Sequence, residues 1–174
     1  MNSLNLSYRL ITKADVGFIF ELYSDWGVAK HLNGIPYPFE LDDSADIVSG
    51  FEEKNENGRN RNYIISFADS DQKCGVCVLN ELTEGRAVLG FSTHPKFKNR
   101  GIASEAANHL IGIAQKEGFS EVQASPVDGN FASTKILIKL GFNIEAKNVK
   151  EVSQHSGMRV STRWIKRLIP NKAV

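Results

Sequence analysis

The sequence has no long apolar run, almost no net charge and only two cysteines. No apolar stretch approaches the roughly 18 residues of a membrane-spanning helix, so we expect no membrane span. The 21 basic residues nearly balance the 20 acidic ones, for a net charge of +1. This balance argues against a nucleic-acid-binding protein, which needs a basic face. The start of the chain has neither the charged nor the apolar part of a secretory signal, so we expect a cytoplasmic protein.

The two cysteines stand three positions apart, in the sequence C-G-V-C. This spacing occurs in redox motifs and in half of a zinc site, but the chain has no second pair. The segment has the pattern of a strand, on which side chains three apart point to opposite faces. We therefore expect Cys74 and Cys77 to be ordinary small residues, and we expect no metal site.

A chain of 174 residues with 41% apolar and 24% charged residues is typical of one globular domain. It contains no repeat, low-complexity tract or linker. We therefore expect a single domain over residues 1–174, with a core from about 4 to 168 and a frayed end from Pro170.

Hydrophobic periodicity predicts an alternation of strands and helices. The expected strands cover residues 4–11, 63–68, 75–82, 86–93, 122–126, 142–152 and 158–168. The expected helices follow Thr12, cover 41–54, run from Gly101 to Gly118, and run from Asn130 or Ser133 to Gly141. Their inner faces are expected to carry Val16, Ile19, Phe20, Tyr23 and Trp26, then Ala45, Ile47, Val48 and Phe51, then Ile102, Ala106, Leu110 and Ile113, and finally Ile136, Leu137 and Leu140. The order is β-α-α-β-β-β-α-β-α-β-β, with an antiparallel meander in its middle.

The most informative segment is F-S-T-H-P-K-F-K-N-R-G-I-A-S-E-A-A, residues 91–107. It predicts the end of a strand, a turn, a basic cluster, a glycine and then an amphipathic helix. The first backbone N–H groups of a helix lack intrahelical partners and, with the helix dipole, favour an anion. Gly101 allows a ligand to approach the backbone closely, and Lys96, Lys98 and Arg100 add positive charge. Such a site suits a pyrophosphate, and a strand that brings a thioester beside it would make an acyl-CoA enzyme.

The run K-N-R-G-I-A, residues 98–103, resembles the acyl-CoA loop Q/R-x-x-G-x-G/A of the GCN5-related N-acetyltransferase (GNAT) superfamily. The longer N-R-G-I-A-S-E-A resembles the branch that acetylates the N-termini of ribosomal proteins. Lys98 departs from the pattern, because it keeps a charged donor but lacks the fork of arginine or the amide of glutamine. Residues 130–142, N-F-A-S-T-K-I-L-I-K-L-G-F, resemble the family segment N-x-x-S…L-G-F. The predicted order of elements is also that of the family, so the resemblance spans nearly the whole chain.

The resemblance implies an α+β acyl-CoA N-acyltransferase fold, with a mixed sheet splayed between strands 4 and 5 and helices on both faces. It implies acetyl-CoA as the donor, a primary amine as the acceptor, and a monomer or homodimer. A backbone N–H of residues 91–93 would then stabilise the oxyanion. The contacts to acetyl-CoA that it implies come from Phe91, Ser92, Thr93, Lys98, Asn99, Arg100, Gly101, Ile102, Ala103, Ser104 and Asn130.

The catalytic residues that the resemblance implies are Ser133 and Asn130. Ser133 would protonate the leaving thiolate, and Asn130 would contact the CoA arm. A thiol with a pKa near about 8.5 leaves readily, so a weak donor suffices. Asparagine and serine are also the ordinary residues of a helix start, so capping is the alternative for both. Relatives outside this branch use a tyrosine one turn further on, where this chain has Leu137.

The general base and the acceptor stay open. The candidate bases are His31, Glu40, Glu81, His94 and water, whereas His109 and His155 are expected to be structural or solvated. An N-terminal amine has a pKa of about 7.7–8.0 and is roughly one-tenth neutral at pH 7, so it needs less help than a lysine. Tyr37 and Phe39, in a proline-rich loop, are expected to contact the acceptor, whereas Trp26 and Phe51 are expected in the core.

The favoured acceptor is the α-amine of a protein or peptide. The alternatives are a small amine, such as a polyamine, an amino acid or an aminoglycoside, or a CoA-binding module without turnover. The acidic helix over residues 41–54 would suit a cationic acceptor or simply face solvent.

Overall fold

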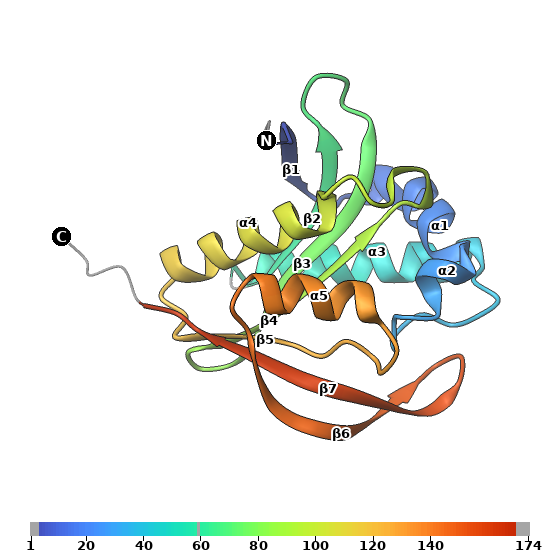
Figure 1. Ribbon diagram of the computed structural model, residues 1–174. Coiled ribbons are helices and arrows are strands. Elements are labelled where there is room, and N and C mark those ends of the chain that lie inside the picture. Colours follow the sequence, from blue (N-terminus) through green and yellow to red (C-terminus); the bar gives the residue numbers. More distant parts are fainter. Residues whose placement is uncertain (1–3, 59, 170–174) are drawn as a thin grey trace.

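The computed structural model describes residues 4–58 and 60–169, which form one seven-stranded sheet (Figure 1). The strands lie in the order β1-β2-β3-β4-β5-β7-β6. Only β4 and β5 run parallel; the other neighbours are antiparallel. The bounds are β1 (Leu6–Leu10), β2 (Arg61–Phe67), β3 (Lys73–Thr83), β4 (Arg86–Thr93), β5 (Glu121–Ala124), β6 (Asn143–Ser153) and β7 (Gly157–Arg167). The predicted α+β class, the meander and the final hairpin are confirmed. The predicted fraying from Pro170 lies outside the described residues.

The helices cover both faces of the sheet (Figure 1). They are α1 (Val16–Ser24), α2 (Trp26–Ala29), α3 (Leu41–Glu56), α4 (Ile102–Lys116) and α5 (Phe131–Lys139). Helices α4 and α5 pack over one buried cluster, which includes Leu79, Leu89, Leu110, Val122 and Leu137. Helices α1 to α3 pack over the other, which includes Ile19, Leu22, Val48, Ile64 and Val76. Within the described residues, no helix is long and apolar enough to cross a membrane.

Strands β4 and β5 part soon after they meet. Their pairing runs only from Arg86 with Glu121 to Val88 with Gln123. On its other side β4 stays paired with β3 as far as Thr93, which lies opposite Gly75. The edge of residues 89–93 that faces β5 is therefore open, and the predicted splay of the sheet is confirmed.

Helix α4 fills the connection between these two strands, and glycines mark both of its ends. Gly101, with a φ of 85°, is the N-cap, and its carbonyl accepts the first helical bond from Glu105 at 3.0 Å. Gly118, with a φ of 82°, follows the last turn. There the N–H of Phe119 returns to the carbonyl of Ala114 at 3.0 Å, which is the Schellman arrangement. Both predicted boundaries of this helix are confirmed.

Trp26, expected in the core, has 47% of its surface exposed. Asp25 has an extended backbone, with a ψ of 115°, so α1 ends there and α2 starts with a new rotation. The apolar spacing of α1 therefore does not continue to Trp26. Phe39 is also misplaced by the prediction, because it is 5% exposed and packs against Tyr23 in the core.

Ala45 was expected on the inner face of α3, but it is exposed. Ser44 is buried in its place, and its hydroxyl donates to the carbonyl of Val16 at 2.7 Å. A hydroxyl that bonds a neighbouring backbone can be buried at little cost, which apolar periodicity does not reveal.

Cys74 and Cys77 lie in the same buried cluster, not on opposite faces of β3. The register steps from Ile65 opposite Gly75 to Ser66 opposite Lys73. Cys74 is therefore an extra residue, a β-bulge that breaks the alternation. Burial raises the pKa of the Cys74 thiol to about 11.

A buried carboxylate ties β1 and β3 to the start of α1. The side chain of Asp15 is fully buried and accepts bonds from Arg9 at 2.6 and 2.8 Å, from Lys73 at 2.7 Å and from the backbone of Thr12 at 2.9 Å. Burial opposes its ionisation, but the bonds from Arg9 and Lys73 outweigh this and hold the pKa of Asp15 well below its usual range.

We predict that Asp15→Asn lowers the free energy of unfolding by about 2–3 kcal/mol at pH 7. Breaking a buried ion pair costs somewhat more, but Arg9 and Lys73 stay partly in water. Because the folded-state pKa is lowered, the contribution of the charge is complete above the unfolded value of about 3.9 and is lost as the pH falls below it. The difference from the parent should therefore shrink on acidification.

Urea unfolding at several pH values measures this difference. Asp46→Asn, on the exposed side of α3, is the matched control and should change stability by less than about 0.5 kcal/mol. Equal midpoints for the two variants would show that the Asp15 network does not stabilise the fold.

Candidate active site

A cavity of about 880 Å³ opens where β4 and β5 part. Its walls are the end of β4 with the loop into α4, the end of β5 with the start of α5, and the segment from Gly27 to Leu32. Every site residue predicted from the sequence lines it: Phe91, Ser92, Thr93, Lys98, Asn99, Arg100, Gly101, Ile102, Ala103, Ser104, Asn130 and Ser133. Two segments about thirty residues apart in sequence therefore meet at one site.

The loop before α4 leaves its backbone accessible. Asn99 and Gly101 both have positive φ values, of 63° and 85°. A Cβ added to Gly101 would come near only Leu4, whose Cδ1 would lie 3.5 Å away. The first N–H groups of α4 thus face open space, which suits the close approach of a phosphate.

The three basic side chains predicted beside this loop have different surroundings. Arg100 lies 5.4 Å from the ring centre of Phe97 and lines the cavity. Lys98 also lines it, and its Nζ would lie 3.2 Å from a Cβ on Gly27 of α2. Lys96 pairs with Glu21 at 3.2 Å and does not line the cavity, so its predicted place beside the anion site is wrong.

Asn130 caps α5, and Ser133 does not. The side-chain oxygen of Asn130 accepts from the backbone N–H of Ser133 at 3.2 Å. Ser133 is the third residue of the helix, and its hydroxyl makes no hydrogen bond within the described residues. That hydroxyl is therefore available to a bound molecule. The question of which residue starts this helix is settled in favour of Asn130.

Thr93, at the end of the open edge of β4, carries a buried hydroxyl with no hydrogen-bond partner in the described chain. Buried polar atoms are almost always bonded, so such an atom in a cavity wall indicates contact with a ligand.

The charges around the cavity have one sign. Its described lining includes Lys30, Lys98, Arg100 and Lys135 but no aspartate or glutamate. The phosphates of CoA are anionic, so this lining, the accessible loop and the free hydroxyls fit that molecule. Two of these cations, Lys30 and Lys135, were not predicted, because neither belongs to a motif.

Phe131 is a further lining residue that the sequence analysis missed. It exposes 75% of its surface directly after the cap of α5. Its position lies off the inner stripe of that helix, on which Leu137 is buried. A large apolar residue off the buried stripe was the available signal.

Of the candidate bases, only His31 lines the cavity. His94 is 5% exposed, and its ring is held by the backbone N–H of Lys96 at 3.3 Å and by Glu21 at 3.2 Å. Glu40 is the N-cap of α3, with its own N–H bonded to Asp43 at 2.8 Å. Both residues serve local structure outside the cavity.

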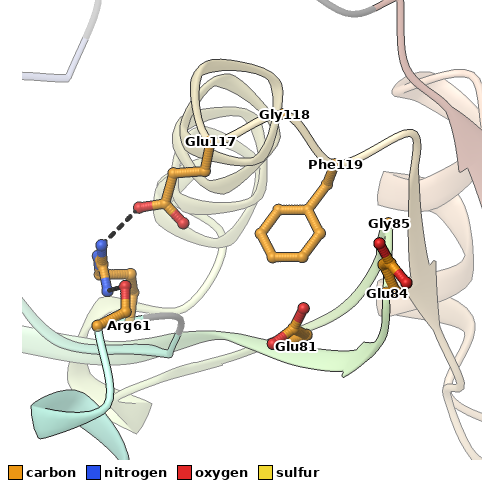
Figure 2. Close-up of a pocket in the computed structure, with 8 residues that line it drawn as sticks. Arg61, Glu81, Glu84, Gly85, Glu117, Gly118 and Phe119 are labelled. Carbon is orange, nitrogen blue, oxygen red and sulfur yellow. Dashed lines mark hydrogen bonds and ion pairs between the residues drawn. The ribbon is translucent and has the colours of Figure 1, made fainter.

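Glu81 lies at a separate hollow of about 360 Å³ (Figure 2). Glu84, Phe119 and the ion pair of Arg61 with Glu117, 2.7 Å long, also line it. This hollow is at the C-terminal end of α4, whereas Gly101 is at the other end, about 20 Å of helix away. Glu81 is thus remote from the cavity at the fork.

The other two histidines also lie outside the cavity lining. His109 stacks on Tyr8 with ring centres 3.7 Å apart, and His155 contacts Trp26 and the carbonyl of Leu32. Within residues 4–58 and 60–169, no three side chains of histidine, cysteine, aspartate or glutamate come together as metal ligands would.

Residues 5–143 match the family described as Acetyltransferase (GNAT) domain. The chain belongs to this GNAT family. It is 24% identical over 143 residues to the uncharacterized N-acetyltransferase p20 of Bacillus licheniformis, which covers 80% of each chain. The protein is therefore an N-acetyltransferase with acetyl-CoA as its donor, and the cavity has the features that this GNAT enzyme needs.

Solved GNAT structures with different acceptors share the fold. A ribosomal L7/L12 α-N-protein acetyltransferase superimposes with a TM-score of 0.81 at 18% identity, over 95% of this chain and 92% of that one. The spermidine N-acetyltransferase from Vibrio cholerae, in complex with CoA and spermine, gives 0.79 at 16% identity, over 94% and 95%. The fold alone therefore does not select the acceptor of this GNAT protein.

We predict that Gly101→Val weakens acetyl-CoA binding at least about tenfold, a loss of 1.4 kcal/mol or more. The new side chain would occupy the space through which a phosphate reaches the backbone. Gly118→Val is the matched control, because it places the same strain, about 1–2 kcal/mol, at the other end of α4, where φ is 82°. Calorimetry should give parental affinity for Gly118→Val. Parental affinity in a folded Gly101→Val would contradict the role of this loop.

Proposed function

We propose that this GNAT protein transfers the acetyl group of acetyl-CoA to the α-amine at the N-terminus of a protein or peptide, and that residues 1–174 act as a single domain. The observation that carries the proposal is the basic lining of the cavity, which lacks carboxylates within the described residues. A polyamine would find no anionic partner there. An N-terminal amine, with a pKa of about 7.7–8.0, carries one titratable charge and is partly neutral at pH 7.

The donor lies along the open edge of β4. Its pyrophosphate binds the first N–H groups of α4, beside Asn99 and Gly101. Its thioester lies in the fork, where a backbone N–H from residues 91–93 stabilises the oxyanion. This assignment rests on the unpaired edge of β4 and the accessible N-terminus of α4.

Ser133 protonates the thiolate as it leaves, and Asn130 holds the start of α5 in place. The free hydroxyl of Ser133 on the cavity wall supports this assignment. A thiolate is a good leaving group, so a hydroxyl donor is sufficient.

The acceptor enters past Trp26 and Tyr37. These rings lie 4.6 Å apart, and each exposes nearly half of its surface. Trp26 directly precedes Gly27, which lines the cavity. An exposed aromatic pair at the edge of a site suits an extended peptide, because aromatic side chains give contact area at low entropic cost.

The alternative acceptor, a polyamine, has weaker support. The acidic residues that would suit it are on α3, which packs on the other face of the sheet from α4 and α5. None of them lines the cavity: Glu40, Asp42, Asp43 and Asp46.

We predict that peptides with a free N-terminus are acetylated with a kcat/KM at least about tenfold above that of spermidine. This factor corresponds to about one favourable or unfavourable charge contact of 1.4 kcal/mol. Release of free CoA thiol measures the rate. The same peptides with a blocked N-terminus are the control and should release no thiol. Turnover of spermidine with no turnover of peptides would exclude the proposed acceptor.

We predict that Ser133→Ala lowers kcat about tenfold to a thousandfold, the range for loss of one positioned proton donor. Acetyl-CoA affinity should stay near parental, and stability should change by less than about 0.5 kcal/mol because Asn130 provides the cap. A thioester of a more acidic thiol should restore part of the lost rate.

Thr134→Ala is the control for this variant. Its hydroxyl donates to the carbonyl of Asn130 at 3.1 Å and does not line the cavity. It should keep the parental kcat. If Ser133→Ala turns over acetyl-CoA like the parent, Ser133 has no chemical role and the thiolate leaves unaided.

A further inference from the structure

We propose that His31 accepts the proton of the attacking amine, a role that rests on the acetyl transfer proposed above. The composition of the cavity wall points to this residue. In the described lining there is no aspartate, glutamate, cysteine or tyrosine, and the lysines and Arg100 are already protonated at neutral pH. His31 is therefore the one lining side chain of the described chain that can take up a proton there.

The ring of His31 has no competing partner. Neither of its nitrogens makes a hydrogen bond within the described residues, and its Nδ1 is buried. The other histidines contrast with it, because His94 is held by Lys96 and Glu21, and His155 is bonded to Leu32. A ring without such bonds keeps an acceptor nitrogen available to a proton that arrives in the cavity.

Cations surround His31 on three elements. Lys30 precedes it, Arg159 reaches it from β7, where it donates to the carbonyl of Lys30, and Lys98 approaches from the loop before α4. Burial and these three charges lower the pKa of His31 below its usual value. The ring is therefore neutral throughout the neutral pH range, which is the state a base requires.

The other titratable groups of the adjoining elements do not reverse this effect. Glu151 of β6 accepts from Asn33 at 2.6 Å, and Asp25 approaches the same point of Gly27 as Lys98. His155, from the turn of the hairpin, contacts Leu32. Tyr23 meets Ser92 from the core, where burial raises the pKa of its phenol, so it cannot act as a base at neutral pH.

The proposed step is balanced. The nitrogen of the neutral amine forms a bond to the carbonyl carbon of the thioester, and the carbon–sulfur bond then breaks. The surplus proton on that nitrogen passes to His31, and the thiolate takes a proton from the hydroxyl of Ser133. His31 releases its proton to solvent, and Ser133 regains one. The net products are an amide, free CoA thiol and the proton that the ammonium form carried.

The test is His31→Gln, with the amine that the parent enzyme acetylates best. At pH 7 we expect kcat to fall about a hundredfold, within the range for a lost general base, with acetyl-CoA affinity within twofold of the parent. At pH 9 the acceptor amine has already lost its proton to solvent, so the deficit should shrink to less than about tenfold. Added imidazole should restore part of the rate of His31→Ala at pH 7.

His109→Gln is the matched control. His109 is half-buried on α4 and outside the cavity lining, so its pH profile should follow that of the parent. An unchanged kcat in His31→Gln, an effect on KM alone, or an equal deficit at pH 7 and pH 9 would each overturn the proposal. Because the acceptor is chosen by turnover, a polyamine-specific enzyme would exclude the proposed acceptor and still test His31.

Discussion

The site depends on one break in the sheet, the parting of β4 from β5 after Val88 and Gln123. A buried backbone edge without partners is costly, so it has to be served by something other than a strand. Here β3 fixes the other edge of β4 as far as Thr93, and the open edge forms a wall of the cavity. The same parting sends the chain out of the sheet and into the loop before α4, so one interruption of hydrogen bonding positions both the thioester and the phosphate ends of the donor site.

The charges at the two ends of α4 oppose the helix dipole. Lys98 and Arg100 stand at its positive end, and Glu117 stands at its negative end. At the negative end, Arg61 compensates within the protein, with an ion pair of 2.7 Å. At the positive end, the described cavity lining includes no carboxylate, so an anionic ligand relieves the repulsion there. The arrangement thus separates an end of the helix that the chain completes itself from one that CoA completes.

The sequence predicted the elements of this fold well because local signals marked them, as at Gly101 and Gly118. It failed where a side chain's place depends on geometry that no local pattern encodes. The extended backbone of Asp25 turns Trp26 outward, and the bulge at Cys74 changes the face of β3. The motif residues of the site were found together, but the candidate bases could not be separated by sequence. Only the folded chain shows that His31 and Glu81 lie at opposite ends of α4.

The hairpin of β6 and β7 gives the molecule a division of labour. Its end is bonded to the segment after α2: the N–H of Gln154 donates to the carbonyl of Asn33 at 2.9 Å, and Arg159 donates to that of Lys30. The wall that holds His31 is therefore braced by residues more than a hundred positions away, whereas the donor wall is one stretch of chain from β4 to α5. Changes in the hairpin can therefore reshape acceptor choice during evolution while the machinery for CoA stays untouched.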